Sequence, residues 1–382
     1  MRIAINALSA KVGSALTFFD NFLPALAEVD DANDYFVIVA PWQAEVLPSV
    51  PRRFKRIVMP GVPRHFLARV LWEQLALPFR LRRLKIDVLY STGNLVTLFP
   101  GCRSVMELTN ASPFSTARIE WSRGEKLKQR FLRSMSMLAA HRADRVIFIS
   151  EDSRDRIAAR CGLSPEKTAV VYYGFTPFAA AAAGPPVRDA DFVFTVSALL
   201  PHKNFETLMR GFDLLVGKHG YAGTLVIAGP PISAAYHEKL LRLRDELAHG
   251  EKIAITGRVS SEELASLYRH ARLFVFPSVE ETLGLPLQEA MGCGLPIAAA
   301  DCRLASVPGE YFNPFREICG EAADYFDPYD PASICESMRR VIENDAYRQR
   351  LVSLGLERVR RFTWDRAARE TLSIFRDLGP RS

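Results

Sequence analysis

The stretch Ser278-Val-Glu-Glu-Thr-Leu-Gly-Leu-Pro-Leu-Gln-Glu289-Ala-Met-Gly-Cys-Gly294-Leu-Pro296 places two carboxylates around a turn that opens a helix. The apolar run 273–276 before it predicts a buried parallel strand, Gly284 allows a tight turn, and Pro286 suits the first helical turn. The backbone N–H groups of residues 283–285 then have no intrahelical acceptor and can bind a phosphate. The pattern fits either a site for a diphosphate ligand or a solvated acidic loop before an ordinary helix.

Length and composition indicate a globular protein of two domains. A chain of 382 residues is too long for one compact core. Its composition, 48% hydrophobic and 24% charged, is that of a globular protein. No run has the length and apolar character of a membrane span, and a strand-like run begins directly at residue 2. The six cysteines are scattered and predict neither a disulfide framework nor a zinc site. We therefore expect a protein of the reducing cytoplasm.

Positive charge is concentrated in the first half of the chain. The formal net charge is +6, and residues 52–85 hold ten Lys and Arg with Glu73 as the one acid. Such a block fits a solvated face, attraction to an anionic acceptor, or contact with the anionic cytoplasmic face of a membrane. No nucleic-acid-binding motif accompanies it, so nucleic acid is not an expected partner.

Strand-like apolar runs alternate with helical patterns, which is typical of doubly wound parallel sheets. The expected strands are 2–7, 35–40, 87–90, 103–108, 145–149, 192–197, 224–228, 252–256, 273–276 and 297–300. The expected helices are 15–28, 65–84, 125–141, 151–161, 330–344, 346–361 and 363–378. A change in composition around five consecutive alanines predicts a linker at 176–190 between domains at 1–175 and 191–362.

The stretch Glu281-Thr-Leu-Gly-Leu-Pro-Leu-Gln-Glu289 resembles the E-x7-E signature of retaining glycosyltransferases with the GT-B fold, in particular glycosyltransferase family 4. The match continues through Ala290, Met291, Gly292, Gly294 and Pro296. The resemblance implies an α/β protein of GT-B architecture, in which two Rossmann-like doubly wound parallel-sheet domains face each other across a cleft. It places the acceptor on 1–175 and the nucleotide sugar on 191–362, with a C-terminal helix in 363–382 packing back on the first domain.

The resemblance also implies roles for residues of the second domain. Glu281 would contact hydroxyls of the donor sugar, Glu289 the ribose, and the intervening amides the diphosphate. Lys203, in Pro201-His-Lys-Asn204, resembles the family's cationic element, whose charge stabilises the leaving diphosphate. Ala198 and His202 stand where the family has arginine, so His202 would supply a second charge only when protonated. The expected donor-binding residues are Glu289, Thr282, Leu283, Gly284, Leu285, Gly13, Arg258 and His202.

In the first domain, the segment from Asn6 to Gly13 resembles the family's glycine-rich loop, of which only Gly13 remains. Thr109 stands where the family commonly has histidine near the donor sugar. We expect the Thr109 hydroxyl to replace that contact, with Glu107 reaching in or reduced activity as the alternatives. The expected catalytic residues are Glu281, Lys203 and Thr109, and the acceptor-side candidates are Asn110, Glu107, Asn94 and Ser91.

By resemblance, the expected activity is metal-independent, retaining transfer of a hexose or deoxyhexose from a GDP- or UDP-linked donor. The expected acceptor is an anionic glycan or lipid-linked glycan in O-antigen, lipopolysaccharide or capsule-type synthesis, with peripheral contact to the inner face of the plasma membrane. No cofactor is expected beyond the donor, and Asp189-Ala-Asp191 is interpreted as a chance match to a metal motif. The alternatives are a GT-B epimerase or phosphorylase, or a non-catalytic nucleotide-sugar-binding assembly subunit.

Overall fold

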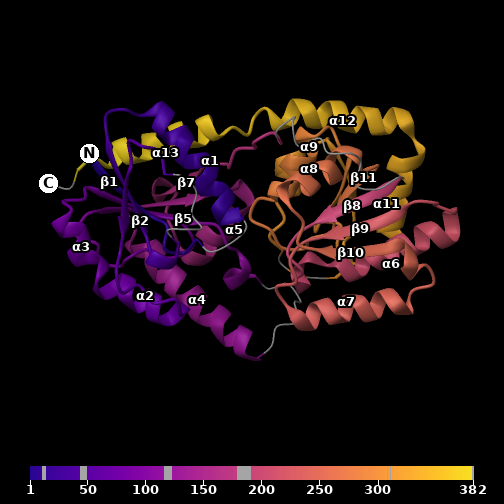
Figure 1. Ribbon diagram of the computed structural model, residues 1–382, viewed down its shortest axis with the longest axis horizontal. Helices are drawn as coiled ribbons and strands as arrows, with labels where there is room; N and C mark the ends of the chain where they lie inside the picture. The colour runs from indigo at the N-terminus through magenta and orange to yellow at the C-terminus, as the bar shows by residue number, and fades with distance from the viewer. Residues whose placement is uncertain are drawn as a thin grey trace. The chain divides into compact units, whose positions relative to one another are not determined.

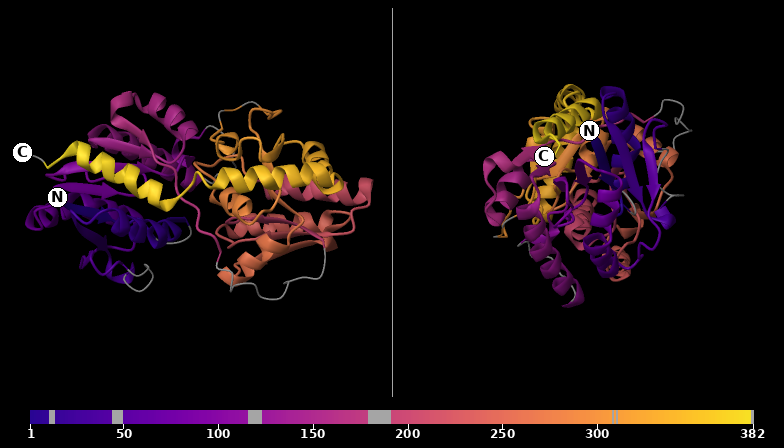
Figure 2. Two further views of the ribbon diagram at one scale, coloured as in Figure 1. Left: turned by 90° about the horizontal axis from the view of Figure 1, so that it is seen from above. Right: turned by 90° about the vertical axis from the view of Figure 1, so that its left-hand side faces the viewer.

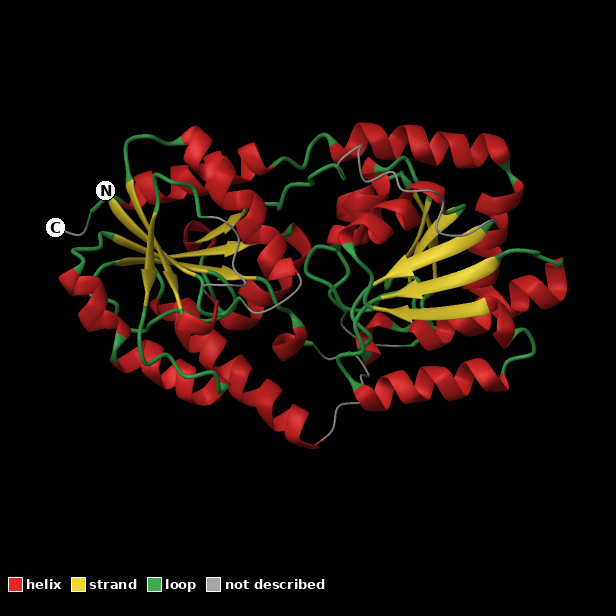
Figure 3. Ribbon diagram, viewed as in Figure 1, coloured by secondary structure: helices red, strands yellow, loops and turns green. Residues whose placement is uncertain are grey.

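The structure is a computed structural model, and it describes residues 1–10, 14–43, 50–115, 123–178, 191–307, 309 and 311–380. The chain divides into two compact units. The N-terminal unit comprises Met1–Phe114, Ser122–Gly174 and Phe362–Ser382, and the C-terminal unit comprises Phe175–Arg361 together with Ser115–Trp121. In each unit helices cover both faces of a central sheet (Figure 3).

The N-terminal sheet has seven parallel strands in the order β3-β2-β1-β4-β5-β6-β7. Its strands are β1 (Arg2–Asn6), β2 (Asp34–Val39), β3 (Lys55–Val58), β4 (Val88–Ser91), β5 (Arg103–Leu108), β6 (Arg145–Phe148) and β7 (Thr168–Val170). Its helices are α1 (Ser14–Val29), α2 (Phe66–Leu75), α3 (Leu77–Arg83), α4 (Arg123–Arg142), α5 (Glu151–Cys161) and α13 (Trp364–Leu378), with 3-10 turns η1 (Pro41–Gln43), η2 (Ser112–Phe114) and η3 (Pro165–Lys167). The central strand β1 is apolar and fully buried at Ile3, Ala4 and Ile5, as a parallel sheet covered on both faces requires.

The C-terminal sheet has six parallel strands in the order β10-β9-β8-β11-β12-β13. Its strands are β8 (Phe192–Val196), β9 (Thr224–Ala228), β10 (Ile253–Gly257), β11 (Leu273–Phe276), β12 (Ile297–Ala300) and β13 (Ala323–Phe326). Its helices are α6 (Phe205–His219), α7 (Ala234–Glu246), α8 (Ser261–His270), α9 (Leu285–Gly292), α10 (Phe315–Cys319), α11 (Pro331–Glu343) and α12 (Asp345–Val359), with 3-10 turns η5 (Pro201–Lys203) and η6 (Gly250–Lys252) (Figure 1).

The predicted fold class is confirmed, since both sheets are parallel and have the doubly wound strand order. The predicted single helix at 65–84 is wrong, because the chain forms α2 and α3 with a break at Ala76. Pro78 follows two residues later and lacks the N–H that a continuous helix needs, which accounts for the break. The strands β3, β7 and β13 are absent from the sequence-based prediction, and each lies at an edge of its sheet.

The helix α13 packs against α1 within the N-terminal unit, and Figure 2 shows the two side by side. Aromatic rings make this contact: the ring centroids of Phe18 on α1 and Trp364 on α13 lie 5.9 Å apart. Farther along α13, the ring of Phe375 lies 5.4 Å from the ring of Tyr90 on β4. The hydroxyls of Tyr90 and Tyr173 hydrogen-bond to the carboxyl of Glu107, which is only 1% exposed. Burial raises the pKa of Glu107 to about 8, and the tyrosine hydrogen bonds offset this only in part.

The raised pKa of Glu107 predicts a pH-dependent stability of the N-terminal unit. The folded state holds a proton on Glu107 between its unfolded pKa of 4.5 and its folded pKa of about 8. The free energy of unfolding therefore falls as pH rises through this window, by roughly 3 kcal/mol between pH 5 and 8. Urea unfolding followed by tryptophan fluorescence reports on this unit, since Trp42, Trp72 and Trp364 belong to it.

The matched variant is Glu107→Gln, which has no proton to lose. We expect the unfolding free energy of this variant to fall less than that of the wild type as pH rises from 5 to 8. The stability of the variant relative to the wild type should therefore increase over this range. Equal pH slopes in the two proteins would contradict the placement of a neutral Glu107 in the core.

Candidate active site at the carboxyl ends of the strands

Each sheet has one point where the chain changes its direction of winding. In the C-terminal sheet this point lies between β8 and β11, and in the N-terminal sheet between β1 and β4. Loops that leave the carboxyl ends of such neighbouring strands diverge, and the crevice between them is the usual ligand site of open α/β sheets. In the C-terminal unit, Lys203 lies in the connection after β8 and Glu281 in the connection after β11.

The Lys203 ammonium forms an ion pair with the Glu281 carboxylate. Their side chains are only 11% and 16% exposed, so both charges are largely removed from water. A pair with so little exposure needs both partners, because removing one leaves a charge without compensation. The structure thus brings together two of the three residues that the sequence assigned to catalysis, whereas Thr109 belongs to the N-terminal unit.

Hydrogen bonds hold the two connections together beneath the ion pair. The carbonyl of His202 accepts from the backbone N–H of Val279 at 3.0 Å and from the Ser278 hydroxyl at 3.2 Å. Asn204 has the left-handed conformation, with φ of 55°, and its amide donates to the carbonyls of Pro277 and Pro328 at 3.4 and 2.6 Å. Asparagine tolerates this conformation better than most residues, which suits the end of Pro201-His-Lys-Asn204. The position of Lys203 is therefore fixed against the Glu281 connection.

Gly284 forms the N-terminal boundary of α9 with φ of +91°. The positive φ favours glycine, and a Cβ at this position would also meet the side chains of Leu287 at 3.1 Å and Phe315 at 3.2 Å, which is tight packing. Pro286 occupies the first turn of α9. Pro286 has no N–H and the Leu287 N–H donates to the Gly284 carbonyl at 2.9 Å, so the donors for an anion are the N–H groups of residues 283–285, beside the positive end of the helix dipole.

Glu289 lies inside α9 and is partly exposed. The hydroxyl of Tyr268, from α8, donates to its Oε2 at 2.7 Å. Burial raises the pKa of the Glu289 carboxyl, and the Tyr268 hydrogen bond offsets this in part. Tyr268 in turn stacks on Phe178, with ring centroids 5.4 Å apart. The orientation of Glu289 is thus set by a partner that the sequence analysis did not identify.

His202 could supply a second positive charge only when protonated, and its surroundings disfavour the protonated form. His202 is 9% exposed, and burial together with the charge of Lys203 lowers its pKa well below 6.5. An imidazole in this position is neutral near pH 7. Lys203 is then the cation that the element Pro201-His-Lys-Asn204 contributes.

Other donor-side candidates have different surroundings. Thr282 and Leu283 are buried in the turn before α9, Leu285 is half-buried, and Arg258 is exposed in the loop after β10. Gly13 lies outside the described residues.

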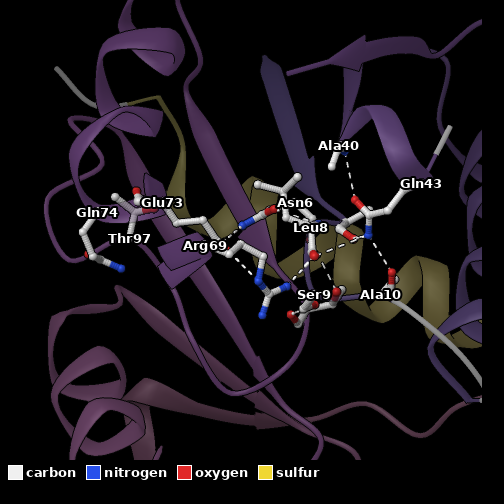
Figure 4. A network of polar contacts seen from close by, with 12 residues as sticks. Asn6, Leu8, Ser9, Ala10, Ala40, Gln43, Arg69, Glu73, Gln74 and Thr97 are labelled. Carbon is white, nitrogen blue, oxygen red and sulfur yellow. Dashed lines mark hydrogen bonds and ion pairs between the residues drawn. The ribbon is translucent and has the colours of Figure 1, made fainter. Parts of the chain in front are cut away.

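In the N-terminal unit, two buried side chains hold the loop that follows β1 (Figure 4). Gln43 Nε2 donates to the carbonyls of Ala7, Leu8 and Ala10 at 2.9, 3.3 and 2.5 Å. The guanidinium of Arg69, on α2, also donates to the Leu8 carbonyl. The carbonyls of Ala7, Leu8 and Ala10 are therefore held by buried side chains.

Arg69 is itself part of a buried charge network. Its Nε lies 3.5 Å from the Glu73 carboxylate, and Glu73 accepts from Asn6 Nδ2 at 3.0 Å. Arg69 and Glu73 are only 5% and 7% exposed. Asn6 completes the network, because its Oδ1 accepts from the Leu8 backbone N–H at 3.1 Å. The end of β1 is thus tied to α2 through one ion pair and its hydrogen bonds.

The acceptor-side candidates fall into two groups. Asn94 Oδ1 accepts from the backbone N–H groups of Thr109 and Asn110 at 3.1 and 2.9 Å, which joins the loops after β4 and β5. Ser91 is fully buried at the end of β4. The candidate Glu107 does not belong with them, because it is enclosed by Tyr90 and Tyr173 in the core. A neutral, buried carboxyl is not available to a ligand as a charge, which corrects its assignment.

Two family descriptions match successive parts of the chain: "Glycosyltransferase Family 4" at residues 25–177 and "Glycosyl transferases group 1" at residues 181–358. The chain therefore belongs to the group 1, or family 4, glycosyltransferases and has the GT-B fold.

Among curated relatives, the chain is 32% identical over 200 residues to a D-inositol 3-phosphate glycosyltransferase of a Nocardioides species, covering 50% of this chain and 42% of that protein. It is 26% identical over 185 residues to O-antigen chain mannosyltransferase B of Escherichia coli, covering 48% and 45%. The matches thus span less than half the length of these relatives.

Among solved structures, sucrose-phosphate synthase of Thermosynechococcus elongatus matches 99% of this chain and 98% of its own, with a TM-score of 0.75 and 19% identity. Anabaena HepE, in complex with UDP-glucose, matches 98% of this chain and 100% of its own, with a TM-score of 0.71 and 18% identity. These likenesses extend over both units and define the fold.

The buried Arg69–Glu73 pair predicts strongly non-additive effects on stability. Arg69→Met leaves the Glu73 carboxylate buried without its cation, and we expect a loss of about 3–5 kcal/mol at pH 7. Arg69→Met/Glu73→Met removes both charges and should lose less than the single variant. Urea unfolding followed by tryptophan fluorescence measures both. The single variant Glu73→Met completes the cycle, and a double variant that loses the sum of the Arg69→Met and Glu73→Met losses would show that the charges do not depend on each other.

Proposed function

We propose that the protein is a retaining, metal-independent glycosyltransferase that moves a hexose or deoxyhexose from a GDP- or UDP-linked donor to a glycan or lipid-linked glycan. The proposed context is cell-surface polysaccharide synthesis of the O-antigen, lipopolysaccharide or capsule type, at the inner face of the plasma membrane. The observation that carries the proposal is the Lys203–Glu281 ion pair at the switch point of the C-terminal sheet, beside the N-terminus of α9.

The ion pair offers complementary groups to the two halves of a nucleotide sugar. A diphosphate would take the Lys203 ammonium as its counter-ion and the N–H groups at the start of α9 as donors. The Glu281 carboxylate, which Lys203 now neutralises, would then accept hydrogen bonds from sugar hydroxyls. Glu289, one turn inside α9 and oriented by Tyr268, would accept from the ribose. Each of these groups recognises a chemically different part of the same ligand.

In the proposed reaction, the bond between the anomeric carbon and the phosphate oxygen breaks, and its electron pair stays on the nucleoside diphosphate. Lys203 and the α9 amides stabilise the charge that develops there. The acceptor hydroxyl attacks the anomeric carbon from the face that the diphosphate leaves, and its proton passes to a phosphate oxygen. The configuration of the anomeric carbon is then retained. This scheme needs no carboxylate nucleophile.

The acceptor is assigned to the N-terminal unit. Asn94, Thr109 and Asn110 lie together at the ends of β4 and β5, beside the loop that Gln43 and Arg69 hold. Thr109 is proposed to contact the donor sugar through its hydroxyl. The similarity to O-antigen and inositol-phosphate glycosyltransferases supports a hydroxyl-bearing acceptor, and the UDP-glucose complex of Anabaena HepE supports a nucleotide-sugar donor.

A panel of GDP-, UDP- and dTDP-sugars tests the proposal. We expect one nucleotide series to raise the thermal transition of the protein, since ligands that bind only the folded state stabilise it. The same donor should be consumed only when an oligosaccharide or lipid-linked acceptor is present, with an unchanged anomeric configuration in the product measured by NMR.

Three other outcomes would each replace the proposal. Conversion of the nucleotide sugar without acceptor would indicate an epimerase, and dependence on inorganic phosphate would indicate a phosphorylase. Binding without turnover on any acceptor would indicate a non-catalytic assembly subunit.

A further inference from the structure

Large apolar side chains are exposed mainly on the N-terminal unit. Of the twelve exposed large hydrophobic side chains among the described residues, nine belong to this unit. Eight of the nine lie on or beside α2, α3 and α4: Leu67, Leu71, Leu75, Phe79, Phe99, Leu127, Phe131 and Leu138. Single exposed leucines are ordinary, but a group of them on neighbouring elements marks an interaction surface.

The spacing of these residues places them on defined helix faces. Leu67, Leu71 and Leu75 recur every four residues along α2, so they form one stripe. On α4, Leu127 and Leu138 lie within about 40° of Phe131 around the helix axis, at about 3.6 residues per turn. Leu75 is 61% exposed and Leu127 is 70% exposed, which shows that neither stripe is covered within the N-terminal unit.

Contacts join the helices into one surface. The rings of Phe66 on α2 and Phe131 on α4 meet at 6.5 Å, and the guanidinium of Arg142 on α4 lies 4.8 Å from the Phe99 ring. Gln74 of α2 accepts from the Leu98 backbone N–H at 2.8 Å, which holds the segment before Phe99 against this helix. Figure 1 shows α2 and α4 along the same edge of the unit.

The polar residues of this surface are almost all basic. Exposed Arg80, Arg82 and Arg83 follow the α2 stripe on α3, and exposed Lys128 and Arg130 lie on either side of the α4 stripe, about 60° and about 100° from Phe131 around the helix axis. The acids on these three helices are Glu73, which is buried with Arg69, and Glu125. We call the eight apolar residues together with these five bases the basic-apolar face.

We propose that the basic-apolar face binds an anionic lipid bilayer, with its leucine and phenylalanine side chains entering the interface and its bases contacting lipid phosphates. Helices that lie in a membrane interface combine an apolar face with Lys and Arg on the flanks. Nucleic acid would account for the charge but not for the apolar stripes. A second copy of the chain would bring two basic surfaces together, which electrostatic repulsion disfavours.

This inference rests on the proposed function for its biological sense, since a lipid-linked acceptor lies at a membrane, but its physical basis is independent of it. Within the described residues, no helix combines the length and apolar character needed to cross a bilayer. The proposed contact is of the kind made by helices that lie in the membrane interface. It also gives a specific role to Arg80, Arg82 and Arg83 of the basic block at residues 52–85, which alone fits a solvated face equally well.

Vesicle co-sedimentation tests the proposal with the full chain. We expect binding to phosphatidylcholine vesicles containing phosphatidylglycerol, weaker binding in high salt, and little binding to phosphatidylcholine alone. The apolar variant Leu67→Ser/Leu71→Ser/Leu75→Ser and the charge variant Arg80→Gln/Arg83→Gln/Lys128→Gln should each bind at least roughly tenfold more weakly.

The C-terminal unit supplies matched controls. Ile232→Ser/Leu304→Ser/Leu356→Ser removes three exposed apolar side chains, and Arg210→Gln/Lys218→Gln/Arg242→Gln removes three exposed charges. Both controls should bind vesicles like the wild type. Thermal unfolding of every variant checks that the fold is intact.

Wild-type binding by the apolar variant, or no binding of the wild type to anionic vesicles, would overturn the proposal. A change from dimer to monomer in the apolar variant, without a change in vesicle binding, would assign the face to a second copy of the chain. Nucleotide-sugar binding, measured separately by thermal shift, should be the same in all these variants. Its absence in the wild type would refute the proposed function while leaving the vesicle result to stand.

Discussion

The ion pair between Lys203 and Glu281 is the interaction on which the candidate donor site depends. Two charges this little exposed are stable only beside each other, and they come from the connections that follow two different strands, β8 and β11. They meet because β8 and β11 are neighbours although some 80 residues separate them along the chain. The strand order, the left-handed Asn204 and the glycine turn at Gly284 all serve to hold this pair in place.

The same pair makes the unliganded site self-neutralising. Lys203 has a counter-ion before any diphosphate arrives, and Glu281 has one before any sugar hydroxyl arrives. In the proposed complex, a nucleotide sugar would replace the contact between Lys203 and Glu281 by one between Lys203 and the diphosphate and one between Glu281 and the sugar. The energy of breaking the ion pair would then be subtracted from the energy of the two new contacts. Glu281 therefore competes with the diphosphate for Lys203 and lowers the affinity, whereas in the proposed site it would orient the sugar relative to the leaving phosphate.

Much of this arrangement could be predicted from the sequence, because it depends on local patterns. The strands of the sheet interiors are continuous apolar runs, and Gly284 with Pro286 indicates the start of α9. The edge strand β3 was not predictable in this way, since Lys55 and Arg56 lie on it and are exposed. Nor could local spacing show that Tyr268 holds Glu289, that tyrosines enclose Glu107, or that burial keeps His202 neutral. Each depends on which elements pack together in three dimensions.

The most direct test is the affinity for the nucleoside diphosphate, measured by calorimetry for the wild type, Lys203→Met, Glu281→Gln and the double variant. Lys203→Met should weaken binding by roughly 10- to 100-fold, the value of a hydrogen bond to a charged group. Glu281→Gln should bind the diphosphate at least as tightly as the wild type, because the carboxylate no longer competes for Lys203. An unchanged affinity in Lys203→Met, or a loss in Glu281→Gln as large as in Lys203→Met, would contradict the account.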